Sequence, residues 1–300
     1  MRAMVDAAWA FRRYQEIRGR LPEAAFREAS ERCAGLGEIA DRFDVFVFDS
    51  FGVLNVGETA VPGAAARIGE LRRTGKKVLV LTNAASLPVL GSEAKYAAFG
   101  FDFSPAEIVM SRSLLVAALA EKQNALQWAV AAPAGADIGD LPGRVQLIDD
   151  AALSEADGFV LLNSRDWTDD RQRALETALA AKPRPVLVGN PDLVAPRENG
   201  FTLQPGAYAH ALADAAGIEP VFFGKPYANA FDAVLDRIGP DVARRRILML
   251  GDTLHTDILG AAAVGMSTAL VTGHGVLAGM DVDACIAVSG IRPDYILPEI

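Results

Sequence analysis

Short apolar runs alternate with helix-like segments from Phe43 onward, and this alternation limits the fold more than any other feature of the chain. The runs predict strands at Val45–Phe48, Val78–Leu81, Phe159–Leu162, Pro185–Val188, Ile247–Leu250 and Thr268–Val271. We expect helices at Ala64–Thr74, Ser92–Phe99, Ser111–Lys122, Asp170–Ala181, Tyr208–Ala216, Ala228–Ile238 and Ile258–Val264. Such alternation produces parallel sheets with right-handed crossovers, and continuously apolar strands indicate a sheet covered on both faces. The sequence therefore predicts an α/β fold with a doubly wound parallel sheet.

The chain divides into three parts. Residues 1–40 are polar and helical in pattern, and Leu21-Pro22 separates a first helix from a second short one. Residues 124–220 have strands and helices of their own, and they interrupt two stretches of similar style. A sheet that stops and resumes about a hundred residues later indicates an inserted domain. We therefore expect a core of residues 41–123 and 221–300, an inserted α/β domain at 124–220, and an N-terminal extension.

Composition narrows the range of partners. A net charge of −9 argues against nucleic acids, whose phosphates are neutralised by Lys and Arg, but it is compatible with small phosphorylated ligands. The two cysteines, Cys33 and Cys285, form neither a disulfide framework nor a zinc motif, which suits a reducing cytoplasm. The N-terminus lacks a signal-peptide core, and no apolar run reaches the roughly 18 residues of a membrane span. We expect a cytoplasmic protein that binds neither nucleic acid nor membrane.

Four segments place reactive side chains where predicted strands end or helices begin. They are Asp49-Ser50-Phe51-Gly52, the pair Thr82-Asn83, Gly224-Lys225-Pro226, and Gly251-Asp252 with Asp257 five residues further on. Open α/β sheets bind ligands at the carboxyl ends of their strands. Each segment alone has an ordinary structural interpretation, such as a turn residue, a surface lysine or a helix cap. Together and in this order, they predict one active site at that edge of the sheet.

These four segments resemble the motifs of the haloacid dehalogenase-like superfamily. Three further pieces are similar to its branch of sugar phosphatases and nitrophenyl phosphatases, namely Val61-Pro62-Gly63-Ala64, Leu71–Lys76 and Asn190-Pro191-Asp192. The resemblance extends from about Phe43 to Gly275. It implies a Rossmann-like core with a cap domain inserted between the second and third motifs, where this chain has its insertion. It also implies that two copies pair through the cap.

The resemblance assigns roles to the motif residues. Asp49 would be the nucleophile that forms an aspartyl-phosphate, which divides one difficult step into two. Mg²⁺ suits the neighbouring carboxylates, because it is a hard ion that oxygen atoms hold. Asp49, Asp252 and the backbone carbonyl of Phe51 are its expected ligands. Asp257 would support the metal waters or orient Lys225.

The remaining motif residues would bind the substrate, a small phosphorylated metabolite. The Thr82 hydroxyl and the Asn83 amide can donate hydrogen bonds to phosphate oxygens. Lys225 can neutralise negative charge as the transition state forms.

Phe51 departs from the family pattern, because phosphatases of the superfamily have a second aspartate at this position. That acid protonates the leaving alkoxide and later activates water, which is worth about 10²–10⁴ in rate. The first interpretation is a phosphohydrolase that is weak, limited to good leaving groups, or supplied with an acid by the cap. The second is 2-haloacid dehalogenase chemistry, in which an aromatic residue stands here and halide leaves without a proton. The third is a pseudophosphatase that binds a phosphorylated ligand or a partner protein.

Retention of the nucleophile, the lysine and the metal acids favours the hydrolase. Asp192 and His255 are two conceivable replacement acids, although a turn residue and a helix-start side chain are the ordinary interpretations. Trp167 could stack on a substrate, and packing is the more ordinary role of a tryptophan. His274 follows the last predicted strand on the catalytic side.

Overall fold

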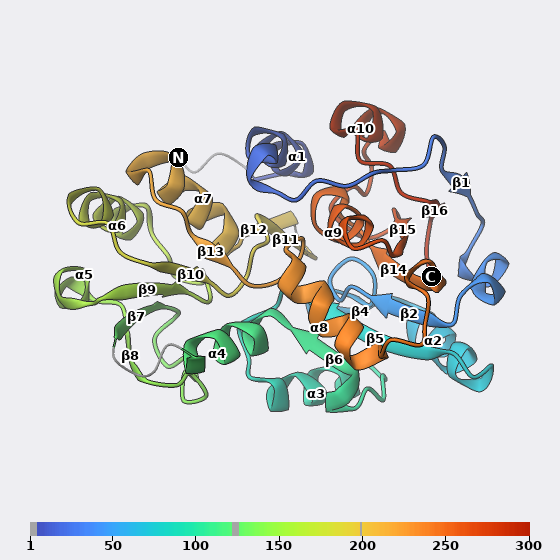
Figure 1. Cartoon of the computed structure of the whole chain (residues 1–300), viewed down its shortest axis with the longest axis horizontal. Helices are drawn as coiled ribbons and strands as arrows, with labels where there is room; N and C mark the ends of the chain where they lie inside the picture. Colours follow the sequence, from blue (N-terminus) through green and yellow to red (C-terminus); the bar gives the residue numbers. More distant parts are fainter. Residues whose placement is uncertain (1–4, 122–125, 199) are drawn as a thin grey trace.

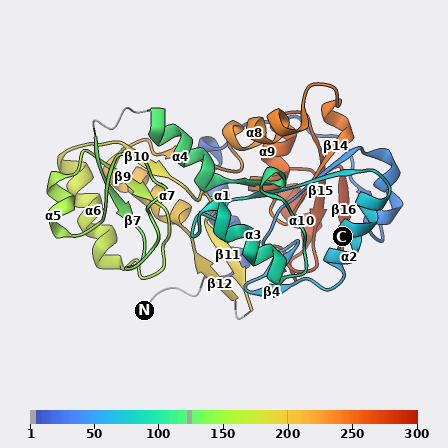
Figure 2. The same cartoon turned by 90° about the horizontal axis from the view of Figure 1, so that it is seen from below.

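The computed structural model describes residues 5–121, 126–198 and 200–300. The chain forms two lobes, each built around a parallel sheet (Figures 1 and 2). We call residues 126–222 the cap lobe, and residues 31–121 with 223–300 the core lobe. The expected boundary at residues 123 and 124, and Lys122 at the end of a predicted helix, lie outside the described residues.

The core lobe contains a seven-stranded sheet in the order β1-β16-β15-β14-β2-β5-β6, and every neighbouring pair is parallel. The strands are β1 (Glu31–Arg32), β2 (Val45–Phe48), β5 (Lys77–Thr82), β6 (Ile108–Met110), β14 (Ile247–Gly251), β15 (Ser267–Val271) and β16 (Tyr295–Leu297). The central strands β14, β2 and β5 coincide with predicted apolar runs. The strands β1, β6 and β16 lie toward the sheet edges, and the sequence did not predict them.

Helices cover both faces of this sheet, which confirms the doubly wound α/β fold. Phe46 and Phe48 of β2 face α2 and α3, whereas Val45 and Val47 face α8 and α9. The core-lobe helices are α2 (Ala64–Arg73), α3 (Val89–Ala98), α4 (Ser111–Glu121), α8 (Ala228–Ile238), α9 (Leu259–Ala263) and α10 (Val282–Ser289). None of the helices in the described residues combines the length and the apolar character needed to cross a bilayer.

The cap lobe contains a second parallel sheet, five-stranded, in the order β13-β10-β9-β7-β8. The strands are β7 (Gln127–Ala131), β8 (Arg144–Leu147), β9 (Gly158–Leu161), β10 (Val186–Val188) and β13 (Val221–Phe222). The helices are α5 (Asp150–Glu155), α6 (Asp169–Ala181) and α7 (Pro205–Ala216). Strand β13 lies beyond the expected boundary at Pro220, because the chain pairs with β10 once more before it returns to the core lobe.

Two antiparallel hairpins meet between the lobes (Figure 2). The core hairpin pairs β3 (Asn55–Val56) with β4 (Thr59–Ala60), and the cap hairpin pairs β11 (Val194–Arg197) with β12 (Gly200–Leu203). Glu198 at the tip of the cap hairpin accepts a hydrogen bond of 2.8 Å from the backbone N–H of Glu58. The hairpins therefore give the lobes a direct contact beside the sheet edge.

The N-terminal extension forms one α-helix, α1 (Ala7–Glu16), followed by a 3₁₀ turn η1 (Arg18–Arg20). The predicted second helix after Pro22 is wrong, because that chain runs in extended form to β1, which pairs with β16. Only the short 3₁₀ turns η2 (Leu36–Glu38) and η3 (Ala40–Arg42) follow. The extension thus belongs to the core-lobe sheet through its own strand.

Candidate active site

Three neighbouring strands carry the predicted reactive residues at their carboxyl ends. Asp49 follows β2, Asp252 follows β14, and Thr82 is the last residue of β5, with Asn83 next. Because β14, β2 and β5 are adjacent and parallel, their ends lie at the same edge of the sheet. The strands themselves are almost entirely buried, so the backbone that holds these side chains is firmly packed.

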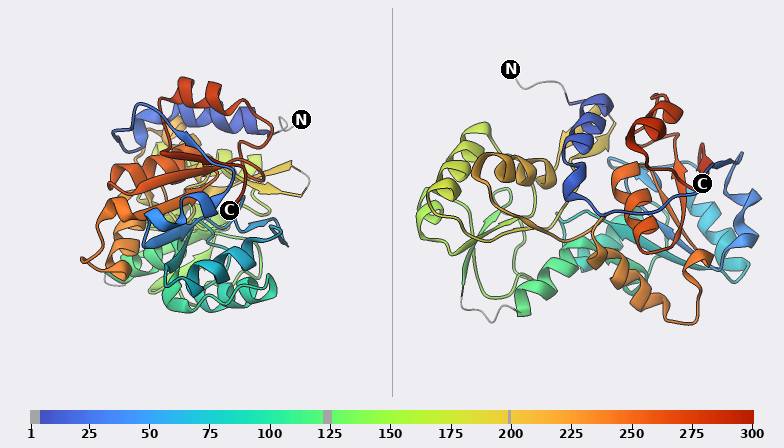
Figure 3. Two further views of the ribbon diagram at one scale, coloured as in Figure 1. Left: turned by 90° about the vertical axis from the view of Figure 1, so that its right-hand side faces the viewer. Right: turned by 45° about the horizontal axis from the view of Figure 1, so that its top comes forward.

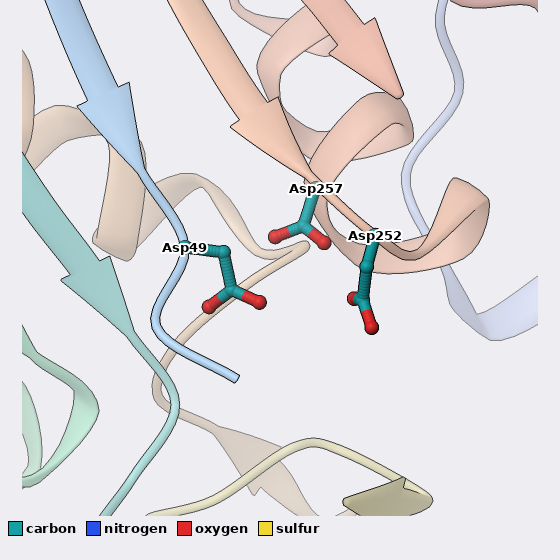
Figure 4. A group of neighbouring side chains, drawn as sticks. All are labelled: Asp49, Asp252 and Asp257. Atoms are coloured by element: carbon teal, nitrogen blue, oxygen red, sulfur yellow. The ribbon is translucent and has the colours of Figure 1, made fainter. Parts of the chain in front are cut away.

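Asp49, Asp252 and Asp257 form a buried acidic cluster (Figure 4). Each offers a carboxylate oxygen, and these oxygens lie within 4.8 Å of one another. Asp257 enters from a π-helical turn, η6 (Leu254–Ile258), which brings it back beside the end of β14. Such a set of hard oxygen donors in a small space matches the preferences of a divalent cation such as Mg²⁺.

Lys225 is the cationic partner of this cluster. Its Nζ donates to Asp49 Oδ1 at 2.5 Å and to Asp257 Oδ1 at 2.6 Å, and its side chain is 2% exposed. Burial alone would lower the pKa of Lys225, but Asp257, Asp49 and Asp192 outweigh it and the pKa is raised. Lys225 is therefore permanently charged and fixed against the predicted nucleophile.

One lysine does not balance three buried carboxylates. Burial is the largest cause that raises the pKa of Asp49, and repulsion from Asp257 and Asp252 adds to it, against the attraction of Lys225. Burial and Asp257 likewise raise the pKa of Asp252, although its oxygens accept bonds of 2.7 Å from Thr253 Oγ1 and from the Val276 N–H. The cluster therefore favours either a bound proton or a bound cation, and the residues present fit a divalent metal.

Glycines allow the loops to approach the acidic cluster. A Cβ on Gly52, which has a φ of +84°, would lie 2.3 Å from Asp252 Oδ2. A Cβ on Gly251 would lie 2.1 Å from the Asp257 Cβ, and one on Gly275 the same distance from the Asp252 Cβ. Any larger side chain at these positions would displace a carboxylate.

Asn83 connects several parts of the site. Its amide nitrogen donates to Asp192 Oδ1 at 2.8 Å and to the Lys225 carbonyl at 2.9 Å, and its oxygen accepts from the Lys225 N–H at 2.7 Å. Both amide hydrogens thus have protein partners, so Asn83 positions Lys225 in this structure. The buried Thr82 hydroxyl accepts a bond of 3.2 Å from the Ala84 N–H, and it also forms a side-chain hydrogen bond with the Tyr96 hydroxyl.

Phe51 lies two residues beyond Asp49, and its half-buried ring is held between two cations. Lys95 Nζ lies 4.2 Å from the ring centroid, and the guanidinium carbon of Arg197 lies 5.3 Å from it. Lys95 comes from α3 and Arg197 from the cap hairpin, so the ring also joins the two lobes. A phenyl ring cannot supply a proton, and this position contributes packing and cation–π attraction instead.

Three other residues that the sequence analysis named are His255, Trp167 and His274. His255 is buried, stacks on Tyr14 with ring centroids 4.9 Å apart, and has a pKa lowered by burial to about 3. It is neutral and does not fit the role of a replacement acid. Trp167 is buried in the cap lobe and donates from Nε1 to Gln172 Oε1 at 2.9 Å, which is a packing role. His274 is exposed.

Asp192 contacts a motif residue of the core lobe, which the sequence did not indicate. It lies in the cap lobe, is half-buried, and reaches across to Asn83 of the core lobe. Burial is the main cause that raises its pKa to about 7, and Asp49 contributes in the same direction. Its segment, Asn190-Pro191-Asp192, was noticeable in the sequence, but its partner is 109 residues away and carries no local signal.

Comparison with known proteins agrees with this geometry. A family model described as haloacid dehalogenase-like hydrolase matches residues 46–138, and one described as HAD-hydrolase-like matches residues 222–300. Glycerol-3-phosphate phosphatase of Gallus gallus is 30% identical over 287 residues, which cover 86% of this chain and 89% of that protein.

Two solved structures are similar to most of the chain. A possible sugar phosphatase from Cytophaga hutchinsonii has a TM-score of 0.78 and 25% identity, and the match covers 90% of this chain and 98% of that one. A haloacid dehalogenase-like family hydrolase from Brucella suis has a TM-score of 0.75 and 26% identity, with coverages of 90% and 99%.

Proposed function

The chain belongs to the haloacid dehalogenase-like hydrolases, and from this premise we propose that it is a metal-dependent phosphatase of small phosphorylated metabolites. The observation that carries the proposal is the contact of Asp49 with Lys225 inside the cluster of Asp252 and Asp257. The relatives named as phosphatases support the same reaction class. No observation favours haloacid chemistry or a purely binding role.

In the proposed metal site, Asp49, Asp252 and the Phe51 carbonyl would hold Mg²⁺, and Asp257 completes the acidic cluster. The excess of buried carboxylates over Lys225 supports this assignment. When bound, the cation would neutralise carboxylate charge and draw phosphate oxygens toward the nucleophile. Because a carbonyl ligand does not depend on the side chain, Phe51 is compatible with the metal.

The proposed reaction uses the chain's own residues in two steps. A carboxylate oxygen of Asp49 attacks phosphorus, and the bond to the organic oxygen breaks with its electron pair on that oxygen. Lys225 keeps Asp49 oriented and neutralises charge that develops on the phosphoryl oxygens, and the Thr82 hydroxyl donates to one of them. Water then cleaves the aspartyl-phosphate and releases inorganic phosphate, which regenerates Asp49.

The first step should depend strongly on the leaving group. Because Phe51 cannot protonate the departing oxygen, substrates whose organic part leaves as a weakly basic anion should be preferred. Acyl and aryl phosphates meet this condition, and simple alkyl phosphates do not. Asp192 is the carboxylic acid of the cap lobe that contacts the motif residues, and it is the candidate for a partial replacement.

The proposal is tested by assaying 4-nitrophenyl phosphate, acetyl phosphate and several sugar phosphates, with Mg²⁺ and with a chelator. We expect turnover that requires the metal and is lost in Asp49→Asn. Asp44→Asn is the matched control, because Asp44 precedes the same strand at its opposite end and pairs with Arg246. Absence of turnover in a protein that still binds Mg²⁺ and phosphate would identify a pseudophosphatase. Metal-independent chloride release from 2-chloropropionate would identify a dehalogenase.

A further inference from the structure

The N-terminal helix lies across the junction of the two lobes. Helix α1 and the turn η1 sit between α7 of the cap lobe and the α9–α10 side of the core lobe, as Figure 1 and the right view of Figure 3 show. This segment lies outside both family matches, which begin at residue 46 and resume at residue 222. It contacts both lobes through different side chains.

On the core side, the contact is an aromatic stack. The ring of Tyr14 lies parallel to His255, with centroids 4.9 Å apart and an interplanar angle of 5°, and Phe11 meets His255 edge-on at 5.5 Å. Tyr14 is only 3% exposed. His255 belongs to the turn that joins Asp252 to Asp257, so α1 packs directly against the backbone that sets the acidic cluster.

On the cap side, the same segment makes polar contacts. Arg13 and Arg20 both pair with Asp214 of α7, the second at 2.6 Å, and Arg20 also donates to the His210 carbonyl at 3.3 Å. Asp214 is partly exposed, and exposed ion pairs contribute little. A buried hydrogen bond of 3.2 Å runs from the Leu193 N–H to the Tyr14 hydroxyl, within an apolar cluster that also includes Leu193 and Val194 of the cap lobe.

Tyr14 therefore joins two pieces of backbone that approach the site from opposite lobes. Leu193 follows Asp192, which bonds to Asn83, and Asn83 in turn holds Lys225 against Asp49. In the sequence, His255 lies between Asp252 and Asp257, two members of the acidic cluster. A rotation of the cap lobe away from the core would have to break either the bond to Leu193 or the stack on His255.

We propose that residues 7–21 are a strap that keeps the cap lobe closed on the core, and that Tyr14 is a positioning residue for the reaction. The positioning role of Tyr14 rests on the proposed phosphatase function, whereas the strap does not. Tyr14 acts through Leu193 and His255 and needs no contact with the substrate. Loss of its hydroxyl leaves a buried N–H of the cap without a partner, which favours opening.

The test compares Tyr14→Phe, which keeps the ring, with Tyr14→Leu, which removes the stack as well. With 4-nitrophenyl phosphate, Tyr14→Phe should lower kcat roughly tenfold or more, because small misplacements of reacting groups cost up to about 10²-fold. KM should stay within about twofold, since no group that binds phosphate is removed. Tyr295→Phe is the control, because it removes a hydroxyl from another buried tyrosine, on β16, the second strand from the sheet edge.

Closure is measured separately with spin labels at Arg73→Cys in α2 and Arg173→Cys in α6, both exposed, while Cys33 and Cys285 are buried. We expect one narrow distance distribution in the parent and a broader, longer one in both Tyr14 variants. An unchanged distribution overturns the strap, whatever the activity. An equal loss of kcat in Tyr14→Phe and Tyr295→Phe overturns the positioning role. If Tyr14→Leu does not fold, Tyr14→Phe decides both questions, and a parent that hydrolyses no phosphate refutes only the proposed function.

Discussion

Restoring an acid at position 51 is the most informative perturbation of this site. Phe51→Asp would place a carboxyl group two residues beyond Asp49, where it could protonate an alkoxide leaving group. General acid catalysis of this kind is worth about 10²–10⁴ in rate. The gain should appear with alkyl phosphates such as glycerol 3-phosphate, and it should be small with 4-nitrophenyl phosphate, whose leaving group needs no proton.

The surroundings of Phe51 set the size of the effect. The new carboxyl group would replace a ring that has Lys95 Nζ at 4.2 Å and the Arg197 guanidinium at 5.3 Å from its centroid. Cations within roughly 4–6 Å lower a carboxyl pKa by about 1–3 pH units, which keeps the group ionised and unable to donate. We therefore expect Phe51→Asp alone to raise kcat/KM about 10–100-fold with alkyl phosphates, at or below the low end of the range for general acids. Adding Lys95→Met should raise this gain further.

The assay is kcat/KM for glycerol 3-phosphate and 4-nitrophenyl phosphate in four proteins: the parent, Phe51→Asp, Phe51→Asp with Lys95→Met, and Phe51→Asn. The asparagine variant matches aspartate in size but has no acidic proton. Equal gains on both substrates would contradict the leaving-group argument, and so would the same gain with asparagine. A double variant no better than Phe51→Asp would show that the two cations do not control the new acid.

Three further outcomes follow from the acidic cluster. Lys225→Met should lower the free energy of unfolding by about 3–5 kcal/mol, because two buried carboxylates lose their partner. Urea denaturation should show a larger loss at pH 8 than at pH 5, because burial raises the pKa of Asp49 and this acid can bind a proton at pH 5. Asp252→Asn should remove most of the rise in Tm that Mg²⁺ produces, and a rise equal to that of the parent would exclude Asp252 as a ligand. Without metal, Tm should fall as pH rises from about 4 to about 8. Folding raises the pKa of Asp49 to about 8 and that of Asp252 to about 7. Between these pH values the folded protein therefore holds protons that the unfolded chain has lost. Mg²⁺ replaces those protons and should flatten the fall, and a flat curve in a chelator would contradict this sign.

The central part of the fold was predictable because its strands are continuous apolar runs. β2, β5 and β14 each contain at least four consecutive buried residues, which is long enough for the run to be recognised in the sequence. β6 and β16 have three residues each, and β1 has two, so their pattern is too short to distinguish from a loop. The prediction of a second N-terminal helix was wrong for a related reason. β1 forms by pairing with β16, and a tertiary contact of this kind cannot be predicted from local propensity.

The acids and the lysine of the site were predictable because each stands at a strand end or helix start. The direction of the Asn83 amide was not, because it depends on Asp192 and on the Lys225 backbone, which are distant in the chain. The position of Tyr14 against Leu193, 179 residues later, is equally invisible to any local pattern. The side-chain hydrogen bonds that cross between the lobes could therefore not be predicted from the sequence.

The same cross-lobe contacts explain how an aromatic residue can be compatible with this site. An aspartate at position 51 would stand between Lys95 and Arg197, and those cations would hold it ionised, whereas a phenyl ring attracts them without adding charge to the cluster. The ring therefore connects α3 and the cap hairpin at the position where the resemblance to superfamily phosphatases implies a second aspartate. Arg197 belongs to the cap lobe, so this contact, like that of Tyr14, depends on closure. Loosening the strap should consequently weaken the contacts of Lys95 and Arg197 with Phe51 as well, and the NMR chemical shifts of that ring would report it.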